Sequence, residues 1–256
     1  MAPLGPEPSM KERLAGGETL LGTFLAMGSP MSAEACGLAG FDWVLVDLEH
    51  GGGHESDMLA QLLGATSAGV HALVRVESAE RSRAARALDY GAEGVMVPQM
   101  PSAAAAREWI AHLHYGPAGH RGVATNHRAA RYGLDPDALT RAAGRTVGIV
   151  QIESMGAVED SEEIAAIDGI DVLFVGPSDL SYSMGRFRRF DDPEFRAALE
   201  RVVAAAENVG KAAGIMVPGP EAIKAAAADG FRMIAVGTDI SLLVQGARAA
   251  VAALQS

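Results

Sequence analysis

The 256-residue chain is poor in cysteine, in lysine and in long apolar runs, and each shortage excludes a class of protein. Its one cysteine, Cys36, lies in the apolar context SAEACGLAG, where we interpret it as a small buried helix residue. A single cysteine excludes a disulfide framework and a cysteine-based zinc site within the chain, which favours a reducing, cytoplasmic location. No apolar run reaches about 18 residues, and no basic segment leads into an apolar one at the start. We therefore expect a soluble, unexported protein without a membrane partner.

The charged residues exclude two further functions. A net charge of -11 would repel nucleic acid phosphates, so we expect no nucleic acid partner. Lysine occurs only at Lys11, Lys211 and Lys224, and none of these lies at the end of an apolar run that could be a catalytic strand. Carbonyl chemistry through a Schiff-base lysine is therefore not expected, and no nucleotide-binding motif is present.

Short apolar runs alternate with Ala-rich stretches along the chain, which is the pattern of parallel strands covered by helices. The predicted strands cover residues 20–27, 42–49, 71–77, 93–99, 146–153, 171–177, 212–218 and 232–238. The predicted helices cover residues 31–39, 56–69, 79–90, 102–113, 155–167, 193–210, 219–229 and 239–254. Eight such units predict an α/β protein with one (β/α)8 TIM barrel over residues 17–256, after a flexible N-terminal tail over residues 1–16. A doubly wound open sheet is the alternative, but no G-x-G-x-x-G follows the first strand to support a dinucleotide site.

Polar residues collect where the predicted strands end, which is where barrel enzymes carry their catalytic residues. Period-2 alternation turns Asp47 and Glu49 toward the barrel mouth and Leu48 toward the helices, with His50 at the rim. The other polar strand ends are Arg75, Gln99, Gln151, Glu153, the turn Gly176-Pro177-Ser178-Asp179, and Thr238 with Asp239, for which helix capping is an equal explanation.

Arg75, Glu153 and Asp179 suit one pocket, although any single polar strand end is equally explained as a solvated one. Two carboxylates without a neighbouring lysine are typical of a site for Mg²⁺ or Mn²⁺. An arginine beside such a metal would bind an anionic substrate or a developing oxyanion.

At these residues the sequence resembles the HpcH/HpaI aldolase family, the metal-dependent class II pyruvate aldolases. The resemblance spans about residues 17 to 250 and is carried by GFDWVLVDLEHG (40–51), LVRVES (73–78), GAEGVMVPQM (91–100), HRGVA (120–124), VQIES (150–154), DVLFVGPSDLSYSMG (171–185) and AVGTDISLL (235–243). It implies a (β/α)8 barrel that acts as an aldehyde-lyase. The reaction would be cleavage of 4-hydroxy-2-keto acids to pyruvate and an aldehyde, and the reverse addition through a pyruvate enolate.

The resemblance also implies roles for the residues at the strand ends. A divalent ion, Mg²⁺ or Mn²⁺ with Co²⁺ as a further possibility, would be held by Glu153 and Asp179. Arg75 would bind the pyruvate keto oxygen, and His50 would act as acid and base. Asp47 and Glu49 would support the nearby water network. Gln151 would hold water or pyruvate, and the turn Gly176, Pro177 and Ser178 would present N–H groups to the pyruvate carboxylate.

Two further positions depart from the simple barrel site. Phe24 stands where the family has a tryptophan, so we expect an apolar substrate contact without an N–H donor. Asp89 matches a family aspartate linked to the histidine, but it precedes the fourth strand, at the opposite rim. It would serve the site of a neighbouring subunit or only the end of its own helix. The resemblance implies a homo-oligomer, a hexamer or trimer of dimers, with the last helix swapped onto a neighbour.

Some candidates and rival functions stay open. His54 follows a Gly-rich loop and is interpreted as a loop residue. The basic residues Arg121, His127, Arg128 and Arg131 of the long connection would bind an acidic aldehyde or make subunit contacts. The rival functions are a CoA-thioester lyase of the citrate or malyl type and a non-catalytic ligand-binding barrel.

Overall fold

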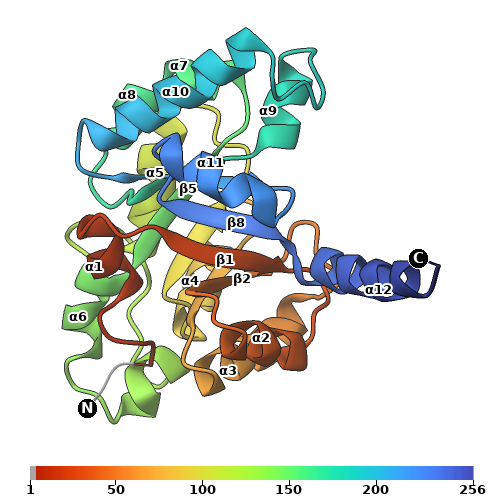
Figure 1. Ribbon diagram of the computed structural model, residues 1–256. Helices are drawn as coiled ribbons and strands as arrows, with labels where there is room; N and C mark the ends of the chain where they lie inside the picture. Colours follow the sequence, from red (N-terminus) through yellow and green to blue (C-terminus); the bar gives the residue numbers. More distant parts are fainter. Residues whose placement is uncertain (1–3, 256) are drawn as a thin grey trace.

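The computed structural model describes residues 4–255, and within them eight parallel strands close into a barrel in chain order (Figure 1). The strands are β1 Leu20–Leu25, β2 Trp43–Asp47, β3 His71–Arg75, β4 Gly94–Val97, β5 Val147–Ile152, β6 Val172–Val175, β7 Ala212–Val217 and β8 Met233–Thr238. Each lies within its predicted range. The predicted (β/α)8 barrel is therefore confirmed, and the alternative of an open doubly wound sheet is wrong.

Helices alternate with the strands in the predicted order, and the structure adds three short helices where none was predicted, before β1, before β5 and after β6. The helices are α1 Met10–Ala15, α2 Pro30–Leu38, α3 Glu55–Ser67, α4 Arg81–Asp89, α5 Ala103–Leu113, α6 Ala138–Arg145, α7 Met155–Glu159, α8 Ser161–Ala165, α9 Pro177–Ser183, α10 Pro193–Glu207, α11 Ile223–Ala228 and α12 Asp239–Gln255, with 3-10 segments η1 Arg128–Gly133 and η2 Pro220–Ala222. The long connection between β4 and β5 contains α5, η1 and α6. No helix among the described residues has the length and apolarity needed to cross a bilayer.

Side chains that alternate along the strands form two apolar layers. One cluster fills the space between strands and helices, and Leu48 packs against it, which confirms its predicted outward direction. The second cluster fills the barrel interior with residues such as Leu45, Leu73 and Phe174. The strands are therefore fixed from both sides, and the residues at their carboxyl ends are held in a rigid frame.

Helix α1 lies inside the stretch that we predicted as a flexible tail. Ser9 caps the helix in a reciprocal capping box with Glu12. Met10 and Leu14 are buried in the same cluster as the barrel interior, so α1 closes the amino-terminal end of the barrel. The six-residue helix is too short to give a periodic apolar pattern, which is why the sequence did not indicate it.

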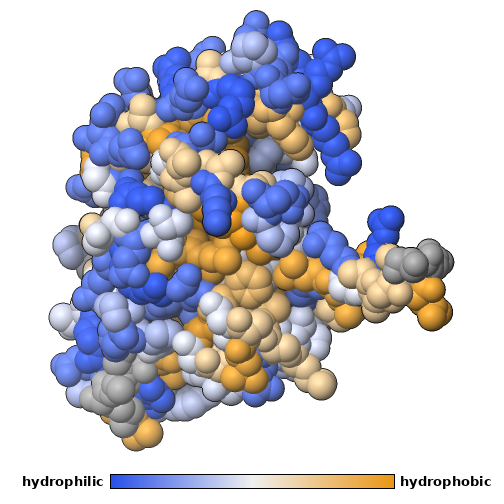
Figure 2. All heavy atoms as spheres, viewed as in Figure 1, coloured by the Kyte–Doolittle hydropathy of each residue, from blue (hydrophilic) through white to orange (hydrophobic). Residues whose placement is uncertain are grey.

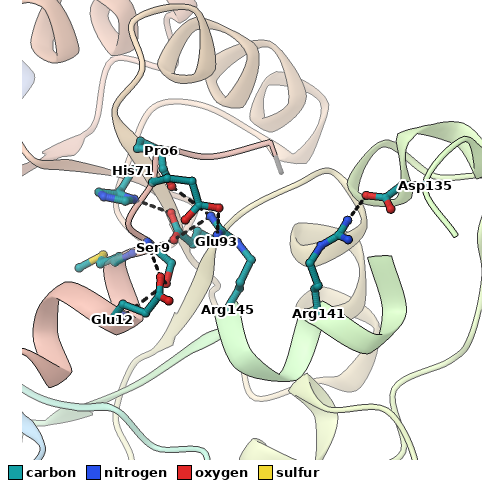
Figure 3. A network of polar contacts seen from close by, with 10 residues as sticks. Pro6, Ser9, Glu12, His71, Glu93, Asp135, Arg141 and Arg145 are labelled. Carbon is teal, nitrogen blue, oxygen red and sulfur yellow. Dashed lines mark hydrogen bonds and ion pairs between the residues drawn. The ribbon is translucent and has the colours of Figure 1, made fainter. Parts of the chain in front are cut away.

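A polar network joins α1 to the strands at this end (Figure 3). Glu93, next to β4, accepts a hydrogen bond from the Met10 backbone N–H at 2.8 Å, and its other oxygen lies 2.6 Å from His71 Nδ1 on β3. Arg145, the last residue of α6, lies 3.6 Å from the same carboxylate. Both His71 and Glu93 side chains are almost fully buried, so this network fixes the amino-terminal rim.

Helix α12 leaves the barrel and projects into solvent, away from the helices that surround the other strands (Figure 1). It exposes an apolar stripe at helical spacing, made of Ile240, Leu243, Val244, Val251 and Leu254. Figure 2 shows apolar surface on this helix and a further apolar region over β8, β1 and α2. In the α2 part of that region, Met31 and Leu38 are 78% and 73% exposed.

Candidate active site

The guanidinium of Arg75 is the centre of a buried polar cluster at the carboxyl ends of β2, β3 and β5. Its Nε and Nη2 donate to the two carboxylate oxygens of Asp47 at 2.9 and 2.7 Å. Its Nη1 lies 3.0 Å from Glu49 Oε2 and 3.3 Å from Gln151 Oε1. The two-point contact with Asp47 fixes the plane of the guanidinium, and Nη1 faces the acids of the mouth.

The predicted partner residues of β2 divide between interior and rim. Asp47 is 3% exposed and also accepts hydrogen bonds from the backbone N–H groups of Glu49 and His50, so it shapes the turn as well as holding Arg75. The His50 side chain is 70% exposed, and its Nε2 lies 3.8 Å from Glu49 Oε1. Burial raises the pKa of Glu49, with Arg75 opposing this shift. Glu49 therefore lies between His50 and Arg75. Alternation along the strand predicted that Glu49 points inward, but not that it contacts both of these residues.

Glu153, directly after β5, is held at both carboxylate oxygens. Gln151 Nε2 donates to Oε1 at 3.0 Å, and the backbone N–H of Gln99 donates to Oε2 at 2.8 Å. Gln99 reaches this position with a φ of 50°, in the left-handed region that non-glycine residues rarely adopt. Sequence reasoning gave Gln99 only as a polar strand end, because no pattern marks a left-handed residue that is not glycine.

The environment of Glu153 favours a proton or another cation. Burial raises the pKa of Glu153 to about 7, the nearby charges of Asp179 and Glu49 add to this, and the Gln99 N–H and Arg75 act in the opposite direction. Asp179 lies in the first turn of α9 and is exposed. A buried carboxylate whose pKa is raised partly by a neighbouring carboxylate offers, with that neighbour, hard oxygen donors for a divalent ion.

The turn at Gly176 approaches Glu153 so closely that only glycine fits. A Cβ on Gly176 would lie 2.3 Å from Glu153 Oε1 and 2.8 Å from its Cγ. The φ of Gly176 is -93°, so the requirement for glycine here is one of space, not of backbone angle. Gly176 therefore brings the start of α9, and with it Pro177, Ser178 and Asp179, against the Glu153 carboxylate.

Phe24 differs from its predicted role. Its ring is 1% exposed, packs against Trp43 and Phe174 in the barrel interior, and lies 5.0 Å from the Arg75 guanidinium. So little exposed surface offers almost no contact to a substrate. The ring instead packs against the guanidinium of Arg75 from the barrel interior.

Of the two residues at the end of β8, Thr238 has the capping role that was the alternative explanation, and Asp239 holds a loop. Thr238 Oγ1 accepts the backbone N–H of Ser241 at 3.1 Å, which caps α12. Asp239 is buried and accepts the N–H groups of Ala26 and Met27. It fixes the loop after β1.

The residues of the amino-terminal rim do not join the cluster around Arg75 within one chain. Asp89, the last residue of α4, accepts a hydrogen bond from Arg121 at 2.6 Å and lies 3.5 Å from His127 Nε2. Arg128 donates to the Tyr90 carbonyl at 2.7 Å. Arg121 and Arg128 are buried against their own chain, which differs from both roles considered from the sequence. Arg131 lies in η1.

His54 lies in the loop between β2 and α3. It caps the start of α3, and its backbone N–H donates to Asp57.

A cavity of about 580 Å³ opens beside the α9 turn. Pro177, Ser178 and Thr238 line it at the barrel mouth, and Phe190 and Phe195 are among its apolar walls. The cavity is large enough for a small organic molecule and reaches the α9 turn, but Arg75, Glu153 and Asp179 are not among the residues that line it.

Similar proteins are known over almost the whole length of the chain. The family model described as HpcH/HpaI aldolase/citrate lyase matches residues 20–246. A hydroxypyruvate/pyruvate aldolase of Paraburkholderia phytofirmans is 37% identical over 253 residues, covering 96% of this chain and 97% of the relative. A 5-keto-4-deoxy-D-glucarate aldolase of Klebsiella pneumoniae is 34% identical over 91% of each chain. The crystal structure of an HpcH/HpaI aldolase/citrate lyase family protein from Burkholderia cenocepacia is similar with a TM-score of 0.92 at 36% identity, covering 96% of this chain and 99% of that one.

Proposed function

Because the chain belongs to the HpcH/HpaI aldolase/citrate lyase family and is an aldolase, a carbon–carbon lyase, we propose that it cleaves 4-hydroxy-2-keto acids to pyruvate and an aldehyde. The same site would catalyse the reverse addition. The observation that carries this proposal is the cluster in which Arg75, Glu153 and Asp179 meet at the carboxyl ends of the strands. The two named relatives, which act on pyruvate-type and keto-deoxy sugar acid substrates, support the substrate class.

The residues at the mouth fit a divalent cation. Glu153 is a buried carboxylate with a raised pKa, and Asp179 and Glu49 add negative charge around it without a lysine among the described neighbours. Glu153 and Asp179 would hold Mg²⁺ or Mn²⁺, since both ions prefer carboxylate oxygens. When bound, the ion would supply Lewis-acid stabilisation of negative charge on the substrate oxygens.

Arg75 would bind the keto oxygen of the substrate. Its Nη1 is the nitrogen that Asp47 does not engage, and it faces Gln151 and Glu49 at the mouth. A guanidinium already fixed by two hydrogen bonds loses little freedom on binding an oxyanion, so it stabilises the enolate with small reorganisation. Gln151, fixed between Arg75 and Glu153, would orient the substrate through its side-chain amide.

His50 and Glu49 would move the proton. In the cleavage direction His50 would accept the proton of the substrate's C4 hydroxyl, and in the addition direction it would accept a methyl proton of pyruvate. The exposed imidazole can exchange that proton with solvent, and Glu49 at 3.8 Å would stabilise its charged form. Asp47 would position Arg75 and does not need to touch the substrate.

The first experiment is exchange of the pyruvate methyl protons with deuterium from solvent, followed by NMR. We expect exchange in the presence of Mg²⁺ or Mn²⁺, and its loss after complete chelation. Glu153→Gln should lose exchange and metal affinity together, while Glu162→Gln, an exposed acid on α8, serves as the matched control. Exchange that survives complete metal removal would contradict the proposal.

The rival functions are separated by two assays. A panel that compares cleavage of 4-hydroxy-2-keto acids with cleavage of malyl-CoA tests the CoA-thioester lyase. A non-catalytic barrel should show no thermal stabilisation by Mg²⁺ or Mn²⁺, whereas the proposed site should be stabilised by either ion. The cytoplasmic location expected from the sequence stays a prediction.

We also propose that the enzyme is a homo-oligomer in which α12 of one copy covers a neighbour's barrel. In a closed (β/α)8 barrel the helix after β8 packs over β8 and β1, but α12 points away, and apolar surface lies over those strands and α2. The stripe that includes Leu243 and Val251 matches that surface in character. Assembly would also allow Asp89 to approach the His50 of a neighbour.

Light scattering during gel filtration tests the assembly. The wild-type protein should be a hexamer or a trimer of dimers, and Leu243→Glu with Val251→Glu should reduce the mass toward the monomer. Ala249→Glu, on the opposite, exposed face of the same helix, is the control. A wild-type mass equal to the 26.5 kDa chain would contradict the swap.

A further inference from the structure

Glu108, His112 and His120 form a cluster of potential metal ligands that the proposed reaction does not use. Glu108 and His112 lie four residues apart on α5, and His120 lies in the loop after it. One ligand atom from each residue lies within 4.8 Å of the others, the arrangement that a single metal ion requires. The cluster is at the carboxyl end of α5, on the amino-terminal side of the barrel and away from Glu153.

We propose that these three residues form a separate binding site for a borderline transition-metal ion such as Zn²⁺, Ni²⁺ or Cu²⁺. Two imidazoles and one carboxylate are the donor set of such ions, whereas Mg²⁺ and Mn²⁺ prefer the oxygens at the barrel mouth. The chain would thus carry two sites that select different metals by donor type.

The distances place the donors near coordination spacing. His120 Nε2 and His112 Nε2 lie 3.7 and 3.9 Å from Glu108 Oε1. Ligand atoms of a tetrahedral site with bonds near 2.0–2.1 Å are about 3.3 Å apart, so small side-chain rotations suffice. His112 Nδ1 and His120 Nε2 lie 2.7 Å apart, a contact that one N–H can bridge and that metal binding would replace.

The surroundings hold the donors in place. His112 is 9% exposed, and its ring makes an edge contact with the buried Trp109. The backbone N–H of His120 donates to the Ala111 carbonyl at 2.9 Å, which fixes the loop on the end of α5. Burial lowers the pKa of His112, the neighbouring His120 lowers it further, and Glu108 only partly opposes these effects, so the neutral imidazole that a metal requires is favoured. A preorganised site loses less entropy on binding.

An ion at this site would join the loop to α5. The next residue, Arg121, binds Asp89 at the end of α4, so the ion would stabilise the connection between two helices of the amino-terminal rim. We therefore expect Zn²⁺ to raise the melting temperature without entering the reaction.

The test uses the full-length, metal-free protein with Zn²⁺ and Cu²⁺ as probes. In competition with a chromogenic chelator, His120→Asn should weaken binding of Zn²⁺ by at least about tenfold, and Glu108→Gln should also weaken it. His54→Asn, at another exposed histidine, should bind as the wild type does. The Cu²⁺ electron paramagnetic resonance spectrum should show nitrogen coupling that His120→Asn reduces.

His120 is half-exposed in a loop, so its substitution should leave the fold intact. The His120→Asn protein should also cleave the substrate with Mg²⁺ at the rate of the wild type. An unchanged Zn²⁺ affinity and an unchanged Cu²⁺ spectrum in His120→Asn would overturn the proposal. Equal loss of Zn²⁺ binding in His54→Asn would overturn it as well, because binding would then not depend on the cluster.

Discussion

Replacement of Gly176 by alanine tests the assignment of Glu153 through a neighbour that carries no chemistry of its own. The added Cβ would lie 2.3 Å from Glu153 Oε1, whereas ordinary contacts begin near 3.4 Å. The carboxylate must therefore retreat by about 1 Å, since the backbone on either side is packed. That movement breaks the hydrogen bonds from the Gln99 N–H at 2.8 Å and from Gln151 at 3.0 Å.

The expected magnitudes follow from this displacement. Overpacking should cost about 1–3 kcal/mol of folding free energy. A ligand displaced by about 1 Å should lower the Mn²⁺ affinity about 10–100-fold and kcat/KM by about 100-fold. Calorimetric titration with Mn²⁺, thermal unfolding and a cleavage assay measure the three effects.

Gly144→Ala is the matched control for this prediction. Gly144 lies in α6, and a Cβ there meets nothing within 4 Å. This variant should bind Mn²⁺ normally and be as stable as the wild type or slightly more stable. A folded Gly176→Ala protein with wild-type Mn²⁺ affinity and activity would refute the placement of the metal on Glu153.

Three further predictions concern charge. Burial raises the pKa of Glu153 from 4.5 to about 7, so between these pH values the folded, metal-free protein keeps a proton that the unfolded chain releases. The free energy of unfolding should therefore fall by about 3 kcal/mol as pH rises from 4.5 to 7. Denaturant titrations should show this decline in the wild type and not in Glu153→Gln. Arg75→Lys keeps the charge but loses the two-point contact with Asp47, so kcat/KM should fall about 100-fold in steady-state assays. The Mn²⁺ affinity should stay near the wild-type value. An equal loss of activity and of Mn²⁺ affinity would contradict a role of Arg75 in substrate binding. Glu93→Ala leaves the buried His71 without its partner and should cost about 3–5 kcal/mol, seen as a melting temperature lower by about 10 °C; an unchanged melting temperature would show that the network in Figure 3 adds no stability.

The sequence predicted the barrel because its strands are buried on both faces and its helices are long enough to show a pattern. Alternation also predicted that Asp47 and Glu49 face inward and Leu48 outward, which the structure confirms. Helix α1 was missed because burial of Met10 and Leu14 depends on contacts with strands far along the chain.

The gathering of polar residues at the strand ends was predictable from the sequence, but the contacts that link them were not. The contact of Phe24 with Arg75, the left-handed Gln99 and the close approach of Gly176 to Glu153 are tertiary features. Each depends on the separation of two segments in space, and no local pattern encodes that separation. The basic residues of the long connection show the same limit, since Arg121 pairs with an acid of its own chain that precedes it by 32 residues.

Helix α1 closes one end of the barrel, and this restricts the route by which the products leave the site. With Met10 and Leu14 sealing one end of the barrel and apolar side chains filling its interior, both cleavage products must leave through the same opening. Pyruvate would lie deeper, against Arg75 and Glu153, so the aldehyde must depart first. Steady-state kinetics should then follow an ordered scheme in which pyruvate inhibits competitively with the hydroxy-keto acid and the aldehyde inhibits noncompetitively. Because the other end of the barrel is closed, the depth at which each product binds sets the order of release.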